Sequence, residues 1–158
     1  MHSPDSSIRS FVDIALVGLQ GYVVLFLLLH DWVPSGRLNH DAAKRRTDPL
    51  AEVLWTTLVA AVPAAIAFWG TATRLHAAYP AWLSWLLWIT YGVLFAGLLK
   101  AWWIPYLFQP DPARAERYKS IFAGTHRFLP EHNGIAPDTL HVSFHIAAVL
   151  VLVLLAVR

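Results

Sequence analysis

Four apolar stretches, each long enough to cross a lipid bilayer, constrain this chain more than any other feature of its sequence. A hydrocarbon core of about 30 Å is crossed by about 20 helical residues. The stretches cover residues 11–29, 50–69, 81–108 and 140–157. Tryptophan and tyrosine residues gather near their ends, as they do at membrane interfaces. The sequence therefore predicts an all-α fold, an integral membrane bundle of four transmembrane helices.

The composition agrees with a membrane protein and limits its partners. The 158 residues are 57% apolar and 14% charged, with a net charge of +2, which is far from a soluble average. Residues 1–158 are expected to form a single membrane domain in contact with the lipid bilayer. No basic stripe interleaved with aromatic residues is present, so no nucleic-acid partner is expected. The absence of cysteine leaves histidine and carboxylate as the available metal ligands.

The first stretch is interpreted as a retained helix rather than a signal peptide. It contains Asp13, has only Arg9 as a basic flank, and shows no small-x-small cleavage pattern. Asp13 is expected to stay hydrated near the interface, whereas Gln20 lies deeper and is expected to bond a neighbouring helix. The second stretch is rich in alanine around Pro63, which predicts close packing inside the bundle.

Lysine and arginine residues predict the orientation, because cytoplasmic loops retain them. The segments 31–48 and 109–138, with Lys100 at the same face, hold nine basic residues, and the other face holds three. Both long segments are therefore predicted to be polar cytoplasmic loops. In a bacterial inner (plasma) membrane, both termini of this multi-pass protein would then be periplasmic.

The final third of the chain holds four of the eight histidines, all between residues 124 and 145. Asn133, Gly134 and Pro137 are turn formers, so an ordered turn is predicted before the last helix. Asp138 or Thr139 is expected to cap that helix. Because His141 and His145 are four residues apart, both imidazoles are expected on one helix face, just inside the membrane surface.

This histidine pair, with other side chains predicted at the same face, indicates a metal site. Two histidines at this spacing can reach one metal ion, although the glutamate usual in helical zinc motifs is replaced by Val142. A transition metal such as zinc or iron would suit these ligands, and metal-bound water could then act on a lipid-like or small apolar substrate. His40 and Asp41 are predicted to lie nearby. The candidate ligands are His141, His145, His126, His132, His30, Asp31 and Glu131.

Other interpretations remain open for the same residues. The histidines could instead bond backbone carbonyls and lipid phosphates, so that the loop 109–138 forms a folded cap that docks a membrane partner subunit or supports a homo-oligomer. Haem between His30 and either His141 or His145 is a narrower case. Transport is disfavoured by the lack of paired intramembrane charges, and nothing in the sequence assigns an enzymatic activity.

Three further side chains receive simple interpretations. Ser143 lies near the histidines but has no strained turn and no third orienting group, so serine hydrolysis is rejected. Glu116 and Tyr118 are expected to be solvated loop residues.

One block of about twenty residues resembles a family. The pattern runs from Thr125, His126, Phe128, Leu129 and Pro130 through Asn133, Pro137, Asp138 and Thr139 to His141 and His145. It resembles a group of small, uncharacterised bacterial multi-span inner-membrane proteins. The resemblance implies an inner-membrane location and carries no assigned activity.

Overall fold

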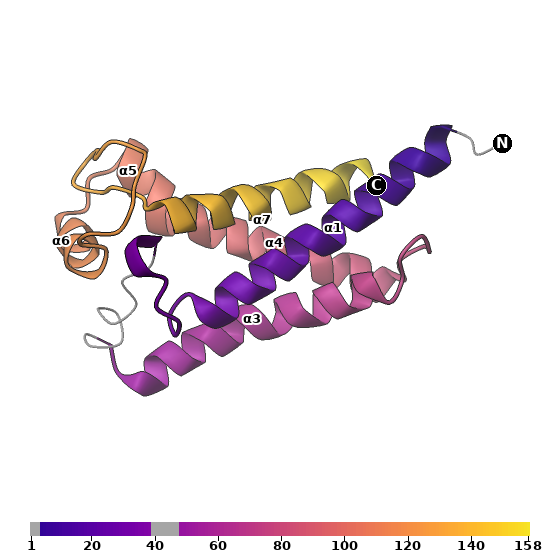
Figure 1. Cartoon of the computed structure of the whole chain (residues 1–158), viewed down its shortest axis with the longest axis horizontal. Coiled ribbons are helices and arrows are strands. Elements are labelled where there is room, and N and C mark those ends of the chain that lie inside the picture. The colour runs from indigo at the N-terminus through magenta and orange to yellow at the C-terminus, as the bar shows by residue number, and fades with distance from the viewer. Residues whose placement is uncertain (1–3, 39–47) are drawn as a thin grey trace.

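The computed structural model describes residues 4–38 and 48–158, with side chains described from residue 8 onward, and its long helices form a bundle (Figure 1). Four helices are long and apolar enough to cross a membrane, which confirms the predicted fold class. Their spans are Ile8–Leu29, Leu50–Ala72, Ala81–Leu107 and Thr139–Val157. The elements, in chain order, are α1 (Pro4–Leu29), η1 (Gly36–Leu38), α3 (Leu50–Ala72), α4 (Ala81–Leu98), η2 (Leu99–Trp103), α5 (Ile104–Leu107), α6 (Pro112–Ile121) and α7 (Thr139–Val157).

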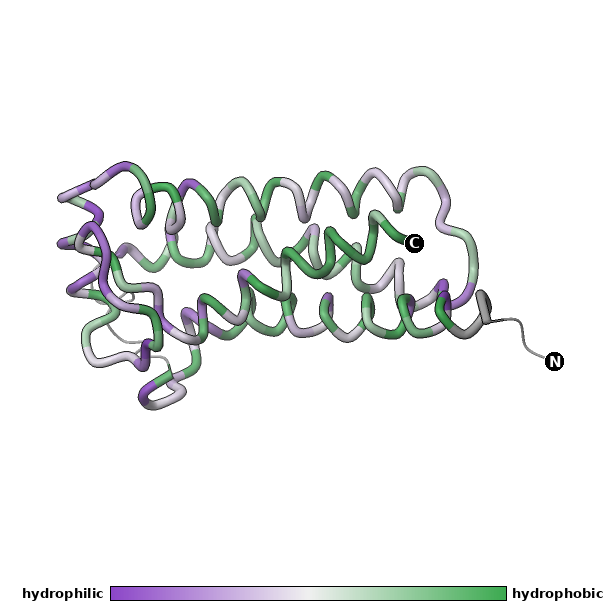
Figure 2. Tube along the Cα trace, turned by 90° about the horizontal axis from the view of Figure 1, so that it is seen from above, coloured by the Kyte–Doolittle hydropathy of each residue, from purple (hydrophilic) through white to green (hydrophobic). Residues whose placement is uncertain are grey.

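The four long helices are arranged so that each packs against two antiparallel neighbours. Helix α1 contacts α3 and α7, and α4 contacts the same two helices. The start of α1, the end of α7 and the short α3–α4 turn lie at one end of the bundle, and η1 and α6 lie at the other (Figure 1). Figure 2 shows hydrophobic residues along the helices and hydrophilic segments gathered at the η1 and α6 end. We call this end of the bundle, where η1 and α6 lie, the polar end.

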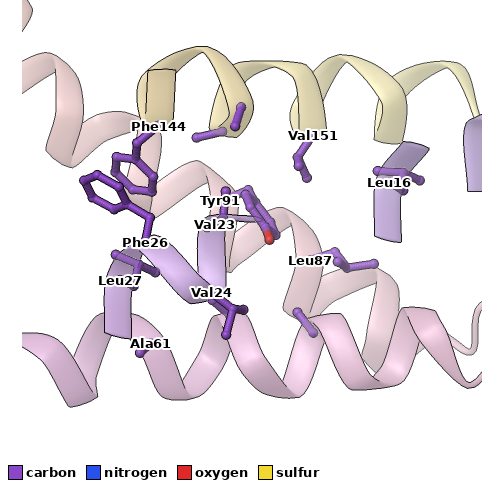
Figure 3. Close-up of a cluster of buried hydrophobic side chains, with 14 of the residues drawn as sticks. Leu16, Val23, Val24, Phe26, Leu27, Ala61, Leu87, Tyr91, Phe144 and Val151 are labelled. Carbon is purple, nitrogen blue, oxygen red and sulfur yellow. The ribbon is translucent and has the colours of Figure 1, made fainter. Parts of the chain in front are cut away.

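Leucine and valine side chains, together with alanine and aromatic residues, fill the interior of the bundle. Ala61, Ala64 and Ala67 of α3 are all buried, so the expected close approach of this helix to its neighbours is confirmed. Toward the polar end, the rings of Phe26 on α1 and Phe144 on α7 stack with centroids 4.1 Å apart (Figure 3). The outward faces are rich in exposed apolar side chains, as expected of surfaces that meet lipid tails.

Buried polar side chains in the bundle differ from the expectations. The carboxylate of Asp13 is buried rather than hydrated, and it accepts hydrogen bonds from Arg158 Nε at 2.6 Å and the His76 backbone N–H at 3.0 Å. Gln20 is fully buried, but its amide has no hydrogen-bond partner among the described residues. The hydroxyl of Tyr91 is also buried and unpartnered within the described chain. The expected interhelical bond of Gln20 is therefore wrong.

The third span changes its helical register as it approaches the polar end. Between α4 and α5, residues Leu99–Trp103 form a π-helix, in which the Ile104 N–H donates to the Leu99 carbonyl five residues earlier. Pro105 follows and has no N–H to donate. A residue with an N–H at position 105 would donate to the Lys100 carbonyl in a π-helix or to the Ala101 carbonyl in an α-helix. Pro105 donates to neither carbonyl.

Helix α6 supplies the missing donors. Arg114 Nη1 donates to the Lys100 carbonyl at 2.8 Å and to the Ala101 carbonyl at 2.9 Å. The Tyr118 hydroxyl also donates to the Ala101 carbonyl, at 3.0 Å. The segment 109–138 is thus not only a loop, because it contains a helix whose side chains complete the hydrogen bonding of the third span.

Candidate functional site

The turn before α7 fixes the position of the histidine-rich end of that helix. Asn133 and Gly134 both have positive φ, 53° and 76°, a conformation for which asparagine and glycine are the favoured residues. A Cβ added to Gly134 would lie 2.8 Å from the Cβ of Ala115 on α6. The turn therefore packs tightly on α6. Asp138 then caps α7 by accepting the His141 backbone N–H at 2.9 Å, which confirms the predicted cap.

The capping carboxylate also orients the His141 ring. Asp138 Oδ2 lies 2.8 Å from His141 Nδ1, and the Asp138 side chain is almost completely buried. With Nδ1 donating to the carboxylate, Nε2 of His141 is left as a lone-pair donor for another group. Metal-bound histidines commonly have a carboxylate partner in this position.

His30 enters the same region from the end of α1. Its Nδ1 lies 2.9 Å from the Phe26 carbonyl, and its Nε2 lies 3.3 Å from Asp31 Oδ1. The side chains are 17% and 7% exposed. The centroids of the His30 and His141 rings are 5.7 Å apart, in an edge-to-face arrangement. Two of the predicted ligands, which are more than 100 positions apart in sequence, are therefore close in space.

His145 lies one turn deeper on α7 and completes a group of three imidazoles. Its ring centroid is 6.3 Å from that of His141. The residue is only 3% exposed, and neither ring nitrogen has a hydrogen-bond partner among the described residues. Leaving a buried polar group unsatisfied costs about 1–3 kcal/mol. We call His30, His141 and His145 the histidine cluster.

Aromatic side chains enclose the histidine cluster. Phe26 stacks on His30 at 4.4 Å and meets His141 edge-on at 5.4 Å. Trp102 of the π-helical segment lies 4.9 Å from His141 and 5.9 Å from His145, between ring centroids. These rings occupy the space beside the imidazoles. The π-helical segment Leu99–Trp103 places Trp102 beside the histidine cluster.

The other predicted ligands are not part of this cluster. His126 Nδ1 lies 2.7 Å from Thr139 Oγ1, and His132 Nδ1 hydrogen-bonds with the Tyr106 carbonyl. Glu131 is exposed, 3.9 Å from Arg127. These histidines attach the segment before α7 to the bundle, as the structural interpretation expected. His40 and Asp41 lie outside the described residues.

The metal-binding geometry is incomplete as the side chains stand. Across the described side chains, residues 8–38 and 48–158, no three histidine, aspartate or glutamate residues form a group that could hold a metal ion. Two imidazoles bound to one tetrahedral zinc ion at about 2.0 Å would have centroids about 5 Å apart. The observed separations of 5.7 and 6.3 Å exceed this value by about 1 Å. Ligation would therefore require ring rotation and a small inward movement. His30 would also have to give up one of its two ring-nitrogen contacts, with the Phe26 carbonyl or with Asp31, to bind the ion.

Some residues of the site were not identified by sequence reasoning. Asp138 was expected only as a cap, although the same carboxylate also bonds the His141 ring; its place three residues before a histidine was the available signal. Tyr118 was expected to be solvated, but it packs on Trp102 with ring centroids 4.5 Å apart. Burial raises the pKa of Tyr118 above its ordinary value of 10.0, and the nearby Arg114 opposes part of that rise.

The fold and the polar end together define a multi-pass helical membrane protein with a largely buried histidine cluster at one end of its bundle. Comparisons with protein-family models, with curated proteins and with solved structures found no match.

Proposed function

We propose that this membrane protein binds a transition-metal ion through the histidine cluster, with His141 and His145 as the first ligands and His30 as the third. The observation that carries the proposal is the His145 ring, which is buried beside His141 with both nitrogens unpartnered among the described residues. Coordination of a metal ion would satisfy one of these nitrogens and offset the cost of burying it.

The surroundings of the cluster support this assignment. Asp138 holds His141 through Nδ1, and Asp31 lies beside His30 Nε2, so a carboxylate is available next to two of the imidazoles. Neutral imidazole with nearby carboxylate suits Zn²⁺, Fe²⁺, Ni²⁺ or Cu²⁺ better than Cu⁺, which prefers sulfur ligands. Water or a substrate would complete the coordination shell, as in metal sites that keep an open position.

The proposed location is the cytoplasmic face of a bacterial inner membrane. The excess of lysine and arginine in the segments 31–48 and 109–138 supports this orientation. Both termini would then be periplasmic. The resemblance of the block 125–145 to small bacterial inner-membrane proteins agrees with this proposal, which predicts that a tag at either terminus is accessible only from the periplasm.

A second candidate function is a folded cap that docks a partner subunit. The observation that favours it is the bonding of His126 to Thr139 and of His132 to the Tyr106 carbonyl. These contacts show that two histidines serve the packing of segment 123–138. If the segment is a docking cap, substitution of His30, His141 or His145 would leave the metal content of the protein unchanged.

Elemental analysis of protein purified in detergent without chelators separates the two functions. The metal-site proposal predicts about one equivalent of a transition metal in the wild type and in His132→Ala, and almost none in folded His145→Leu. Leucine is chosen because an apolar side chain removes the unpartnered nitrogens without leaving a large cavity. A metal-free wild type, after incubation with Zn²⁺ and desalting, would contradict the proposal and favour the docking cap. An absorption spectrum of the same samples tests for haem.

A further inference from the structure

Two short segments at the polar end lie side by side where α7 enters the membrane. The His126 N–H donates to the Arg37 carbonyl at 2.6 Å, and the Thr139 N–H donates to the His126 carbonyl at 2.9 Å. Thr139 is the first residue of the fourth span. Residues 37–38 and 126–128 are therefore held at the level of the membrane interface.

These segments expose two cationic and two apolar side chains, which we call the interfacial strip: Arg37, Leu38, Arg127 and Phe128. Leu38 is 46% exposed and Phe128 is 59% exposed. Apolar side chains at this depth bury themselves at the boundary between headgroups and acyl chains. The strip thus combines features suited to an amphipathic ligand.

The two arginines of the strip differ from those on α6. Within the described chain, no acidic side chain pairs with Arg37, and Arg127 has only a 3.9 Å contact with the exposed Glu131. Arg117 on α6, by contrast, pairs with Asp48 at 2.7 Å. The guanidinium groups of the strip are therefore available to an external anion, and guanidinium binds phosphate through paired hydrogen bonds.

We propose that the interfacial strip binds the phosphate headgroup of an anionic phospholipid. The arginines contact the phosphate, while Leu38 and Phe128 contact the upper part of the acyl chains. The phospholipid is favoured over a soluble phosphate compound because the exposed apolar side chains stand beside the charges at the membrane surface. This binding is independent of the histidine cluster.

Native mass spectrometry of the full chain in detergent, titrated with phosphatidylglycerol, tests the proposal. The double variant Arg37→Gln/Arg127→Gln is expected to bind the lipid about 30-fold more weakly, equivalent to about 1 kcal/mol for each arginine near an anionic surface. The matched control Arg117→Gln also removes a basic side chain and is expected to bind within about twofold of the wild type, because its partner is Asp48.

A second variant tests the apolar half of the strip. The Phe128 side chain is exposed, so Phe128→Ala is expected to fold. The variant should bind phosphatidylglycerol more weakly than the wild type, while the salt dependence of lipid binding stays unchanged. Equal loss in Arg117→Gln and in the double variant would overturn the proposal in favour of general charge attraction. Equal affinity for phosphatidylcholine would also overturn it, as would displacement of the lipid by millimolar inorganic phosphate.

Discussion

Arg114 is expected to stabilise the third span because it bonds two carbonyls of the π-helical segment, one of which Pro105 leaves without a backbone donor. Its guanidinium donates to the carbonyls of Lys100 and Ala101. A hydrogen bond from a charged donor contributes about 1.5–3 kcal/mol, so two bonds at the lower end give about 3 kcal/mol. The side chain is 28% exposed, and solvent screening reduces the expected loss in Arg114→Met to about 2 kcal/mol.

A double-mutant cycle tests the reason for this loss as well as its size. Pro105→Ala restores a backbone N–H, which can donate to one of the two carbonyls. In that background, Arg114→Met is expected to cost only about 1 kcal/mol, so the two changes should show a coupling energy of about 1 kcal/mol.

The free energy of unfolding is to be measured in mixed micelles by denaturant titration, followed by far-ultraviolet circular dichroism. Arg117→Met is the control on the same helix, and it should cost less than about 1 kcal/mol because its ion pair is exposed. Single-variant costs that add to within about 0.5 kcal/mol in the double variant would refute the link between Arg114 and the Pro105 gap.

Four further substitutions test interactions at other positions. Asp13→Ala should lower the free energy of unfolding by about 3 kcal/mol, because it leaves the guanidinium of Arg158 without its buried carboxylate partner. A denaturant titration in which the variant is as stable as the wild type would contradict a stabilising ion pair. Gly70→Ala should destabilise by about 1–2 kcal/mol, since its Cβ would lie 2.7 Å from a leucine methyl on α4. Gly92→Ala, with open space around its Cβ, should stabilise the protein by about 0.5–1 kcal/mol. A Gly92→Ala variant less stable than Gly70→Ala would refute the close contact described at Gly70. Burial raises the pKa of Tyr118 above its ordinary value of 10.0. The stability that the buried neutral phenol contributes is therefore present below pH 10.0, and it is lost as the pH rises through the higher folded pKa. In unfolding titrations between pH 9 and 12, about the range in which the phenol ionises, Tyr118→Phe should lack this loss of stability.

The spans could be predicted from sequence because long apolar runs have few alternatives to a membrane helix. The π-helical segment could not, because its stability depends on Arg114 and Tyr118, which approach from another helix. The capping role of Asp138 was readable from its position before α7, since capping is a local interaction.

The candidate site was predicted in part. Sequence spacing identified His141 and His145 as neighbours, and the topology brought His30 to the same end. His126 and His132 were grouped with them because sequence places all of these residues near one membrane face. Their separation from the cluster depends on tertiary contacts with Thr139 and Tyr106, which no local pattern encodes.

X-ray absorption at the metal edge of the zinc-loaded protein tests the proposed metal site most directly. The proposal predicts two or three imidazole nitrogens at about 2.0 Å, with the multiple-scattering pattern of histidine. In His145→Leu, at least one imidazole should be missing from that shell. A shell of oxygen atoms alone, or a spectrum that does not change in His145→Leu, would contradict metal binding by the histidine cluster.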